Sequence, residues 1–136
     1  MVKVIMGLKG SGKTKQLINS INTAIKTESG SMVCIEKGSA LTFDIDYRVR
    51  LIDASEYDIG NYTFLKGFIS GLHAGNFDIT HIFLDGLYKL SGSKDPEETA
   101  DFLAWCESFG KANNMEFTIS ISDDAAKMPE GITKYL

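Results

Sequence analysis

Short continuous runs of apolar residues alternate along this chain with longer stretches in which apolar residues recur every three or four positions. Short runs are typical of buried strands, and the longer spacing is typical of amphipathic helices. The runs predict five strands, at residues 2–6, 32–36, 48–53, 80–87 and 115–121. The longer stretches predict three helices, at residues 13–28, 61–76 and 95–114, and a further short helix is expected near Pro129.

Strands that alternate with helices predict an α/β fold, in which a mostly parallel sheet carries helices on both faces as a three-layer sandwich. Polar residues alternate with apolar ones at residues 48–53, which predicts a strand near an edge of the sheet. The same alternation at residues 115–121 predicts a strand with one less apolar face. The chain has no repeat, linker or low-complexity tract, so residues 1–136 are expected to form one domain.

Local signals predict how the helices begin, end and pack. Asp95 is expected to cap the last long helix, because Pro96 takes its first position and Glu98 lies three residues after the cap. Gly30 is expected just past the end of the first helix. The second helix is expected to bury one face, formed by Phe64, Leu65, Phe68, Ile69 and Leu72.

The composition is that of an ordinary soluble domain, since 43% of the 136 residues are hydrophobic and 24% are charged. The net charge of −4 argues against a surface that coats nucleic acid, so nucleic acid is not expected as a partner. Arginine occurs only at Arg48 and Arg50, inside one predicted strand. Nucleotide kinases usually clamp phosphates with an arginine-rich lid, which this chain lacks. Because lysine also binds phosphate, kinase activity is disfavoured without being excluded.

The chain is expected to be cytoplasmic and not to associate with membranes. A strand that begins at Val2 leaves no room for a signal peptide, and no apolar run approaches the length needed to span a bilayer. Cys34 and Cys106 fall on apolar faces, which predicts buried free thiols. His73 and His81 are not spaced like metal ligands from each other or from the cysteines, so neither is expected to bind a metal.

A glycine-rich segment joins the first predicted strand to the first predicted helix. Residues 7–14 read Gly-Leu-Lys-Gly-Ser-Gly-Lys-Thr and fit the pattern G-x-x-x-x-G-K-[ST]. Glycines let the backbone curl so that successive N–H groups point at phosphate oxygens, and the helix that follows adds its positive N-terminal end. A lysine at a helix N-terminus is electrostatically unfavourable without an anion, so Lys13 also indicates a phosphate-binding loop.

The pattern and its position resemble those of P-loop NTPases, in which the pattern is the Walker A motif. The resemblance implies that Lys13 reaches the β- and γ-phosphates as a catalytic residue, and that the Thr14 hydroxyl ligates Mg²⁺. Backbone N–H groups of the loop would form the phosphate cradle. The implied nucleotide-binding residues are Gly7, Lys9, Gly10, Ser11, Gly12, Lys13 and Thr14. Partition-type ATPases carry an extra lysine that would fall at position 8, where this chain has Leu8, so that subfamily is rejected.

A second element of P-loop NTPases is a buried strand that ends in a carboxylate. Residues 82–85, Ile-Phe-Leu-Asp, resemble this Walker B strand, and the resemblance implies that Asp85 holds Mg²⁺ through water. Many ATPases place a glutamate directly after that aspartate to activate the attacking water, but here Gly86 stands there. RecA-like members carry the base on a different strand. Glu36 and Asp53, which end the second and third predicted strands, are the two candidates, and both are expected to be exposed.

The last predicted strand leads to two expectations, a polar contact with the γ-phosphate and a position for this strand in the sheet. Ser122 and Asp123 end the last predicted strand, where RecA-like enzymes make a polar contact that senses the γ-phosphate. A strand that follows the Walker B strand after a helix resembles the additional-strand division, in which that strand lies between the P-loop and Walker B strands. Type II thymidine kinases share this core, but they add a zinc lobe with clustered cysteines that this chain lacks.

The motifs favour ATP over GTP, because the chain has no Asn-Lys-x-Asp sequence and no Asp-x-x-Gly after the Walker B-like strand. As a whole the chain also resembles short bacterial proteins described only as ATP-binding. Three functions stay open. The first is a weak or partner-activated Mg²⁺-dependent ATPase, with self-association supplying Arg48, Arg50 or a lysine in trans as one form of activation. The second is a nucleotide-dependent switch without useful turnover, and the third is a kinase for a small acceptor.

Overall fold

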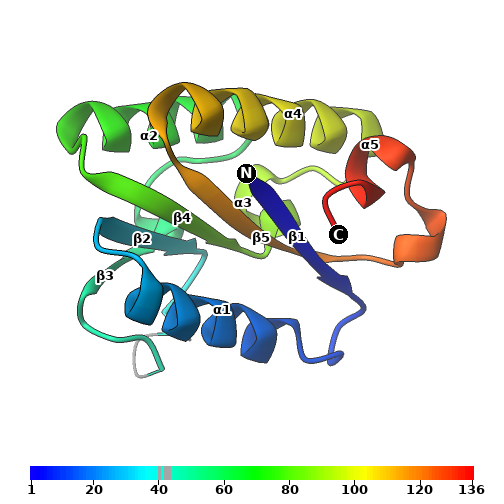
Figure 1. Cartoon of the computed structure of the whole chain (residues 1–136). Helices are drawn as coiled ribbons and strands as arrows, with labels where there is room; N and C mark the ends of the chain where they lie inside the picture. The colour runs from blue at the N-terminus through cyan, green and yellow to red at the C-terminus, as the bar shows by residue number, and fades with distance from the viewer. Residues whose placement is uncertain (40, 42–43) are drawn as a thin grey trace.

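The computed structural model describes residues 1–39, 41 and 44–136. Within these residues one parallel sheet contains the strands β1 (Val2–Gly7), β2 (Ser31–Glu36), β3 (Val49–Asp53), β4 (Ile79–Asp85) and β5 (Glu116–Ser122). The strands lie side by side in the order β1-β5-β4-β2-β3 (Figure 1). Because all five run in the same direction, their carboxyl ends meet at one edge of the sheet, where open α/β sheets commonly bind ligands.

Helices cover both faces of the sheet, as the sequence predicts. α1 (Lys13–Thr27) lies on one face, and α2 (Tyr62–Gly75) and α4 (Pro96–Asn113) lie on the other (Figure 1). The remaining described elements are α3 (Leu87–Ser91), α5 (Glu130–Thr133), and the 3₁₀ turns η1 (Ala54–Glu56) and η2 (Ala125–Lys127). None of the described helices has the length and apolar character that a membrane crossing requires.

The central strand β4 is buried on both faces, which explains its continuous apolar run. Ile82, Phe83 and Leu84 are all 0% exposed. Successive side chains of a strand point to opposite faces, so Phe83 packs with Leu17 and Ile21 in the core beneath α1. Ile82 and Leu84 belong to the other core, beneath α2 and α4. Burial of each side chain of this size contributes about 1.5–3 kcal/mol to folding.

Two predictions about strand positions are confirmed. β5 lies between β1 and β4, and β3 lies at an edge of the sheet. The other edge strand is β1, whose apolar run does not predict an edge position. The end of the chain covers this edge, because the backbone N–H of Val4 donates to the carbonyl of Tyr135 at 2.8 Å, beside the C-terminus in Figure 1.

The last strand has one less apolar face, as the sequence predicts, but that face is buried. Thr118 and Ser120, the polar residues of β5, are only 4% and 1% exposed. They alternate with apolar residues because each makes a hydrogen bond inside the protein, Thr118 to His81 and Ser120 to Asp85. The polar residues of β5 therefore bind polar partners inside the protein and do not form a solvent-exposed face.

The helix starts are confirmed, while one predicted face is partly wrong. Asp95 caps α4, with its carboxylate accepting from the backbone N–H of Glu98 at 3.2 Å. On α2, Leu65 and Ile69 are 0% exposed, but Phe64 is 60% exposed. One position separates Phe64 from Leu65, and this rotation of about 100° places its ring on the outer side of the helix.

The carboxyl end of α1 is tied to the sheet through a buried histidine. Glu28 follows the helix, and its carboxylate lies 2.9 Å from Nδ1 of His81, while Nε2 lies 2.8 Å from the Thr118 hydroxyl. Burial lowers the pKa of His81, although the Glu28 carboxylate opposes this. Gly30 is not the terminator of the helix that its position predicts. It gives space, because a Cβ there would overlap the side chain of Thr80.

Both cysteines are buried free thiols, as the sequence predicts. Cys34 lies on β2 and Cys106 on α4, and each is 0% exposed. Burial raises the pKa of both thiols, so neither is a thiolate near neutral pH. They therefore act as small apolar residues of the core.

Candidate functional site

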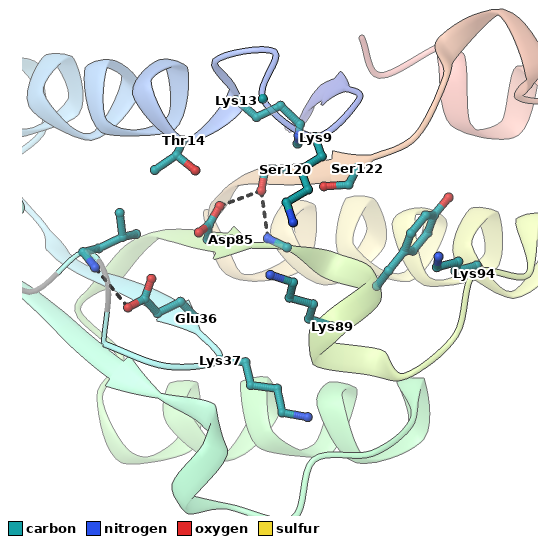
Figure 2. Close-up of a pocket in the computed structure, with 14 residues that line it drawn as sticks. Lys9, Lys13, Thr14, Glu36, Lys37, Asp85, Lys89, Lys94, Ser120 and Ser122 are labelled. Atoms are coloured by element: carbon teal, nitrogen blue, oxygen red, sulfur yellow. Dashed lines mark hydrogen bonds between the residues drawn. The ribbon is translucent and has the colours of Figure 1, made fainter.

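A pocket of ≈ 500 Å³ opens at the carboxyl edge of the sheet (Figure 2). Its walls come from the loop at residues 7–14, the start of α1, the ends of β2, β4 and β5, and α3 with the segment after it. The sequence-predicted residues that line it are Lys9, Gly10, Lys13, Thr14, Glu36, Asp85 and Ser122. Segments from across the whole chain thus meet in one concave site.

The loop at residues 7–14 is shaped by glycines. Gly10 and Gly12 have φ of 84° and 89°, in the left-handed region that other residues rarely adopt. Gly7 is needed for space, because a Cβ there would overlap the side chain of Ser11. Of the loop residues, Lys9, Gly10, Lys13 and Thr14 line the pocket, whereas Gly7, Ser11 and Gly12 do not.

The N-terminus of α1 faces the pocket without a side-chain cap from any described residue. Gly12 is the N-cap position, and the first turn contains no acidic residue. The first N–H groups of a helix have no partner within the helix and carry partial positive charge. Lys13 and Thr14, the first two residues of α1, line the pocket at this end. This geometry favours an anion as ligand.

Lys13 is folded back on its own loop. Its ammonium group donates to the carbonyl of Leu8 at 3.0 Å, in an exposed position. An exposed hydrogen bond of this kind contributes only about 1 kcal/mol, so an anion in the loop can compete for the ammonium group. The lysine is thus within reach of both the loop carbonyl and the pocket.

Asp85 ends β4 and is held by a serine from the neighbouring strand. The Ser120 hydroxyl donates to Oδ1 of Asp85 at 2.8 Å and accepts from the backbone N–H of Gly86 at 2.8 Å (Figure 2). Oδ2 of Asp85 makes no hydrogen bond with another described residue. Ser120 fixes the orientation of the carboxylate. The only sign of this residue in the sequence is its place among the alternating polar residues of β5.

Glu36 lies next to Asp85, because β2 pairs with β4 and places these two residues in register. Its side chain lines the pocket, and Oε1 accepts from the backbone N–H of Leu41 at 3.1 Å. The expectation of an exposed strand end is wrong for Glu36, which is 3% exposed. Burial arises because β2 is flanked by two strands and Leu41 covers its end.

Asp53 does not line the pocket. Its Oδ1 accepts from the backbone N–H of Gly38 at 2.8 Å, and from the N–H and hydroxyl of Ser55 at 2.9 and 2.6 Å. The Ser55 hydroxyl, with the two N–H groups, holds the pKa of Asp53 below its usual value. Asp53 therefore caps η1 and fastens the segment after β2, in a structural position.

The two candidates at the end of β5 also separate. Ser122 lines the pocket, whereas the carboxylate of Asp123 accepts from the Tyr88 hydroxyl at 2.8 Å and from the backbone N–H of Asp124 at 2.8 Å. Burial, with the Asp123 carboxylate as a second cause, raises the pKa of Tyr88. The Tyr88–Asp123 contact joins α3 to the end of β5.

Positive charge concentrates in the pocket although the chain is acidic. Five lysines line it, Lys9, Lys13, Lys37, Lys89 and Lys94, against two carboxylates, Glu36 and Asp85. None of the ion pairs between described residues includes a lysine. Sequence reasoning missed the last three lysines, because no pattern distinguishes them from the other lysines of the chain.

Arg48 and Arg50 lie elsewhere. Both line a second pocket, together with Tyr57 and Phe68, and neither lines the pocket that contains Asp85. Arg48 is ion-paired with Asp46 at 3.2 Å. Neither arginine can therefore act on a ligand of the Asp85 pocket within one chain.

The pocket combines two kinds of group on opposite sides. Figure 2 shows Thr14, Asp85 and Glu36 along one side, and Lys9, Lys89 and Ser122 across from them. The first side offers oxygen atoms that suit a hard cation, and the second offers ammonium groups that suit an anion. The sequence matches no protein-family model and no curated protein, so these residues and their geometry are what bear on function.

Proposed function

We propose that this chain is an ATP-binding protein of the P-loop type that uses Mg²⁺ and hydrolyses ATP slowly. One observation carries the proposal. A glycine loop with two left-handed residues presents an uncapped helix N-terminus to a lysine-rich pocket that also contains Asp85. A polyphosphate chain matches both the backbone N–H groups and the lysines.

The phosphates are proposed to lie in the loop at residues 7–14. Backbone N–H groups from Lys9 to Thr14 form the cradle, and Lys13 exchanges its bond with the Leu8 carbonyl for the β- and γ-phosphates. Lys9 and Ser122 contribute from the pocket wall. ATP is favoured over GTP only because the chain lacks the guanine-reading motif.

The oxygen-bearing side of the pocket fits Mg²⁺. Thr14 offers a hydroxyl, and Asp85 offers a carboxylate whose Oδ1 is already oriented by Ser120. Hard oxygen atoms, with several retained waters, are the ligands that Mg²⁺ prefers. Bound there, the ion would neutralise charge on the β- and γ-phosphates.

The sheet order supports the comparison with RecA-like proteins. β5 lies between β1, which leads into the glycine loop, and β4, which ends in Asp85. The additional-strand division has this arrangement. Glu36, on the strand next to β4 and in register with Asp85, is the proposed base that activates water.

The test of the proposal is a calorimetric titration of the chain with ATP, GTP and AMP, with and without Mg²⁺. We expect saturable binding of Mg²⁺–ATP, weaker binding of GTP, and little binding of AMP, which lacks the phosphates that the loop would hold. A chain that binds none of the three at millimolar concentration contradicts the proposal.

Asp85→Asn should reduce the gain in ATP affinity that Mg²⁺ provides, without reducing the affinity for ATP in the absence of Mg²⁺. Asparagine keeps an oxygen that accepts from Ser120, so the fold and the metal-free affinity should stay the same. Loss of a group that orients metal-bound water typically costs about ten- to a hundredfold in metal affinity. Titrations with and without Mg²⁺ measure this increment, and Asp101→Asn, on the exposed side of α4, is the matched control. An unchanged increment in Asp85→Asn removes Asp85 from the metal site.

A further inference from the structure

The short helix α3 holds a single exposed side chain, and that side chain is a lysine. Leu87, Leu90 and Ser91 are at most 1% exposed, and Tyr88 is 8% exposed. Lys89 alone among the five residues is exposed, and it lines the pocket. Because the other four residues of α3 are buried, Lys89 is the residue of this helix that is exposed to solvent at the pocket.

Both ends of α3 are fixed by the backbone. Gly86 and Gly92 have φ of 75° and 68°, so a left-handed residue stands on each side of the helix. At Gly92 the backbone also packs closely, since a Cβ there would lie 3.0 Å from the carbonyl of Gly60. The Tyr88 hydroxyl adds a third anchor through its 2.8 Å bond to Asp123. Lys89 therefore projects from a rigid support.

The stem of Lys89 lies along Gly86, directly after Asp85. A Cβ at Gly86 would be 3.7 Å from Cδ of Lys89 and 3.9 Å from its Cβ, which is ordinary van der Waals contact. Figure 2 shows the side chain extending from α3 back across the pocket, with its nitrogen toward the side that holds Glu36 and Asp85. Where many ATPases carry a glutamate after the Asp, this chain directs a cation instead.

The net positive charge of the pocket favours an anion near the Lys89 ammonium group. Five lysines and two carboxylates sum to a charge of +3, and no described carboxylate forms an ion pair with Lys89. Like charges repel one another, although four of the five lysines are exposed to solvent, which weakens the repulsion. A Mg²⁺–triphosphate, with a charge of about −2, would offset most of this charge.

We propose that Lys89, on α3, contacts the terminal phosphate of a nucleoside triphosphate whose phosphates lie in the glycine loop. This inference rests on the proposed function of the pocket. Lys89 makes the site selective for triphosphates over diphosphates, because a diphosphate has no group at that position. The chain thereby supplies in cis a cation of the kind that Arg48 or Arg50 could supply only from a second copy.

The test is a pair of titrations, with the Mg²⁺ complexes of a nonhydrolysable ATP analogue and of ADP. Lys89→Met keeps the apolar stem along Gly86 and removes the charge, and Lys89→Gln is a second variant with a polar end. Lys111→Met, on the exposed last turn of α4 and outside the pocket, is the control. We expect both Lys89 variants to lose about tenfold or more in affinity for the analogue, equivalent to about 1.4 kcal/mol, and less than about threefold for ADP. The control should change neither affinity.

Equal losses for both nucleotides, or no loss for either, would overturn the role of Lys89 while leaving nucleotide binding by the parent intact. The role of Lys89 would also be overturned if its variants lose the binding of inorganic phosphate, measured in the presence of ADP, while their affinity for the ATP analogue is unchanged. Lys89 would then serve a separate anion. A parent chain that binds neither nucleotide overturns the proposed function itself, and the role of Lys89 with it. Melting curves of the variants that match the parent establish that the fold is kept.

Discussion

Mg²⁺–ATP is expected to raise the melting temperature of the parent chain by about 10 °C at a hundredfold excess over the dissociation constant, and Lys13→Ala should remove most of that rise. A ligand that binds only the folded state stabilises it by about 2.7 kcal/mol at this excess. Each kcal/mol shifts the melting temperature of a domain of this length by roughly 4 °C. The effect is large because the proposed cradle holds the β- and γ-phosphates, where Lys13 acts.

The same substitution should barely change the melting temperature without nucleotide. Lys13 is only partly buried, and its described hydrogen bond is the exposed one to the Leu8 carbonyl. Removing a cation from the positive end of α1 offsets part of that loss. Thermal melts of the parent, of Lys13→Ala and of Lys15→Ala measure both effects, since Lys15 is an exposed residue of the same helix outside the pocket. A full nucleotide shift in Lys13→Ala would contradict phosphate binding by this lysine.

The parts of the site that could be predicted from the sequence are those encoded locally. Residues 7–14 match the pattern G-x-x-x-x-G-K-[ST] by their spacing, and the buried run that ends in Asp85 can also be recognised without a structure. The long helices and five strands were also predictable, because each is long enough for its apolar period to repeat. The place of β5 between β1 and β4 was predicted from the resemblance to the additional-strand division, and it is confirmed.

The remaining residues depend on contacts between distant segments. α3 has five residues, too few for a helical period to repeat, so the sequence does not predict that Lys89 faces the pocket. The polar alternation of β5 does not by itself reveal the role of Ser120, because it does not distinguish a solvent-exposed position from one with a buried partner such as Asp85. Phe64 was assigned to the buried face because a spacing of three or four residues leaves the rotation of the helix uncertain by about one position.

The choice between Glu36 and Asp53 illustrates the same limit. Both residues end a predicted strand with a carboxylate, and the sequence treats them alike. The sheet separates them, because β2 pairs with β4 and puts Glu36 beside Asp85, whereas β3 lies at the edge. Neighbouring strands are roughly 5 Å apart, so Asp53 stands about one strand further from Asp85.

Glu36→Gln is expected to slow ATP hydrolysis by about a hundredfold or more, which is the usual cost of losing a general base. The amide keeps an oxygen that can accept from the backbone N–H of Leu41, so the buried end of β2 should hold its structure. ATP affinity should therefore stay close to that of the parent. Phosphate release under single-turnover conditions, with affinity measured separately, distinguishes a lost base from lost binding.

Asp53→Asn is the matched comparison, since it makes the same chemical change at the end of the next strand. Asp53 is occupied by Gly38 and Ser55 and does not line the pocket, so its variant should hydrolyse ATP within about threefold of the parent rate. A hundredfold loss in Asp53→Asn with none in Glu36→Gln would reverse the assignment. If neither variant slows hydrolysis, the attacking water is activated by another group, and the burial of Glu36 beside Asp85 serves to orient the pocket, not to move a proton.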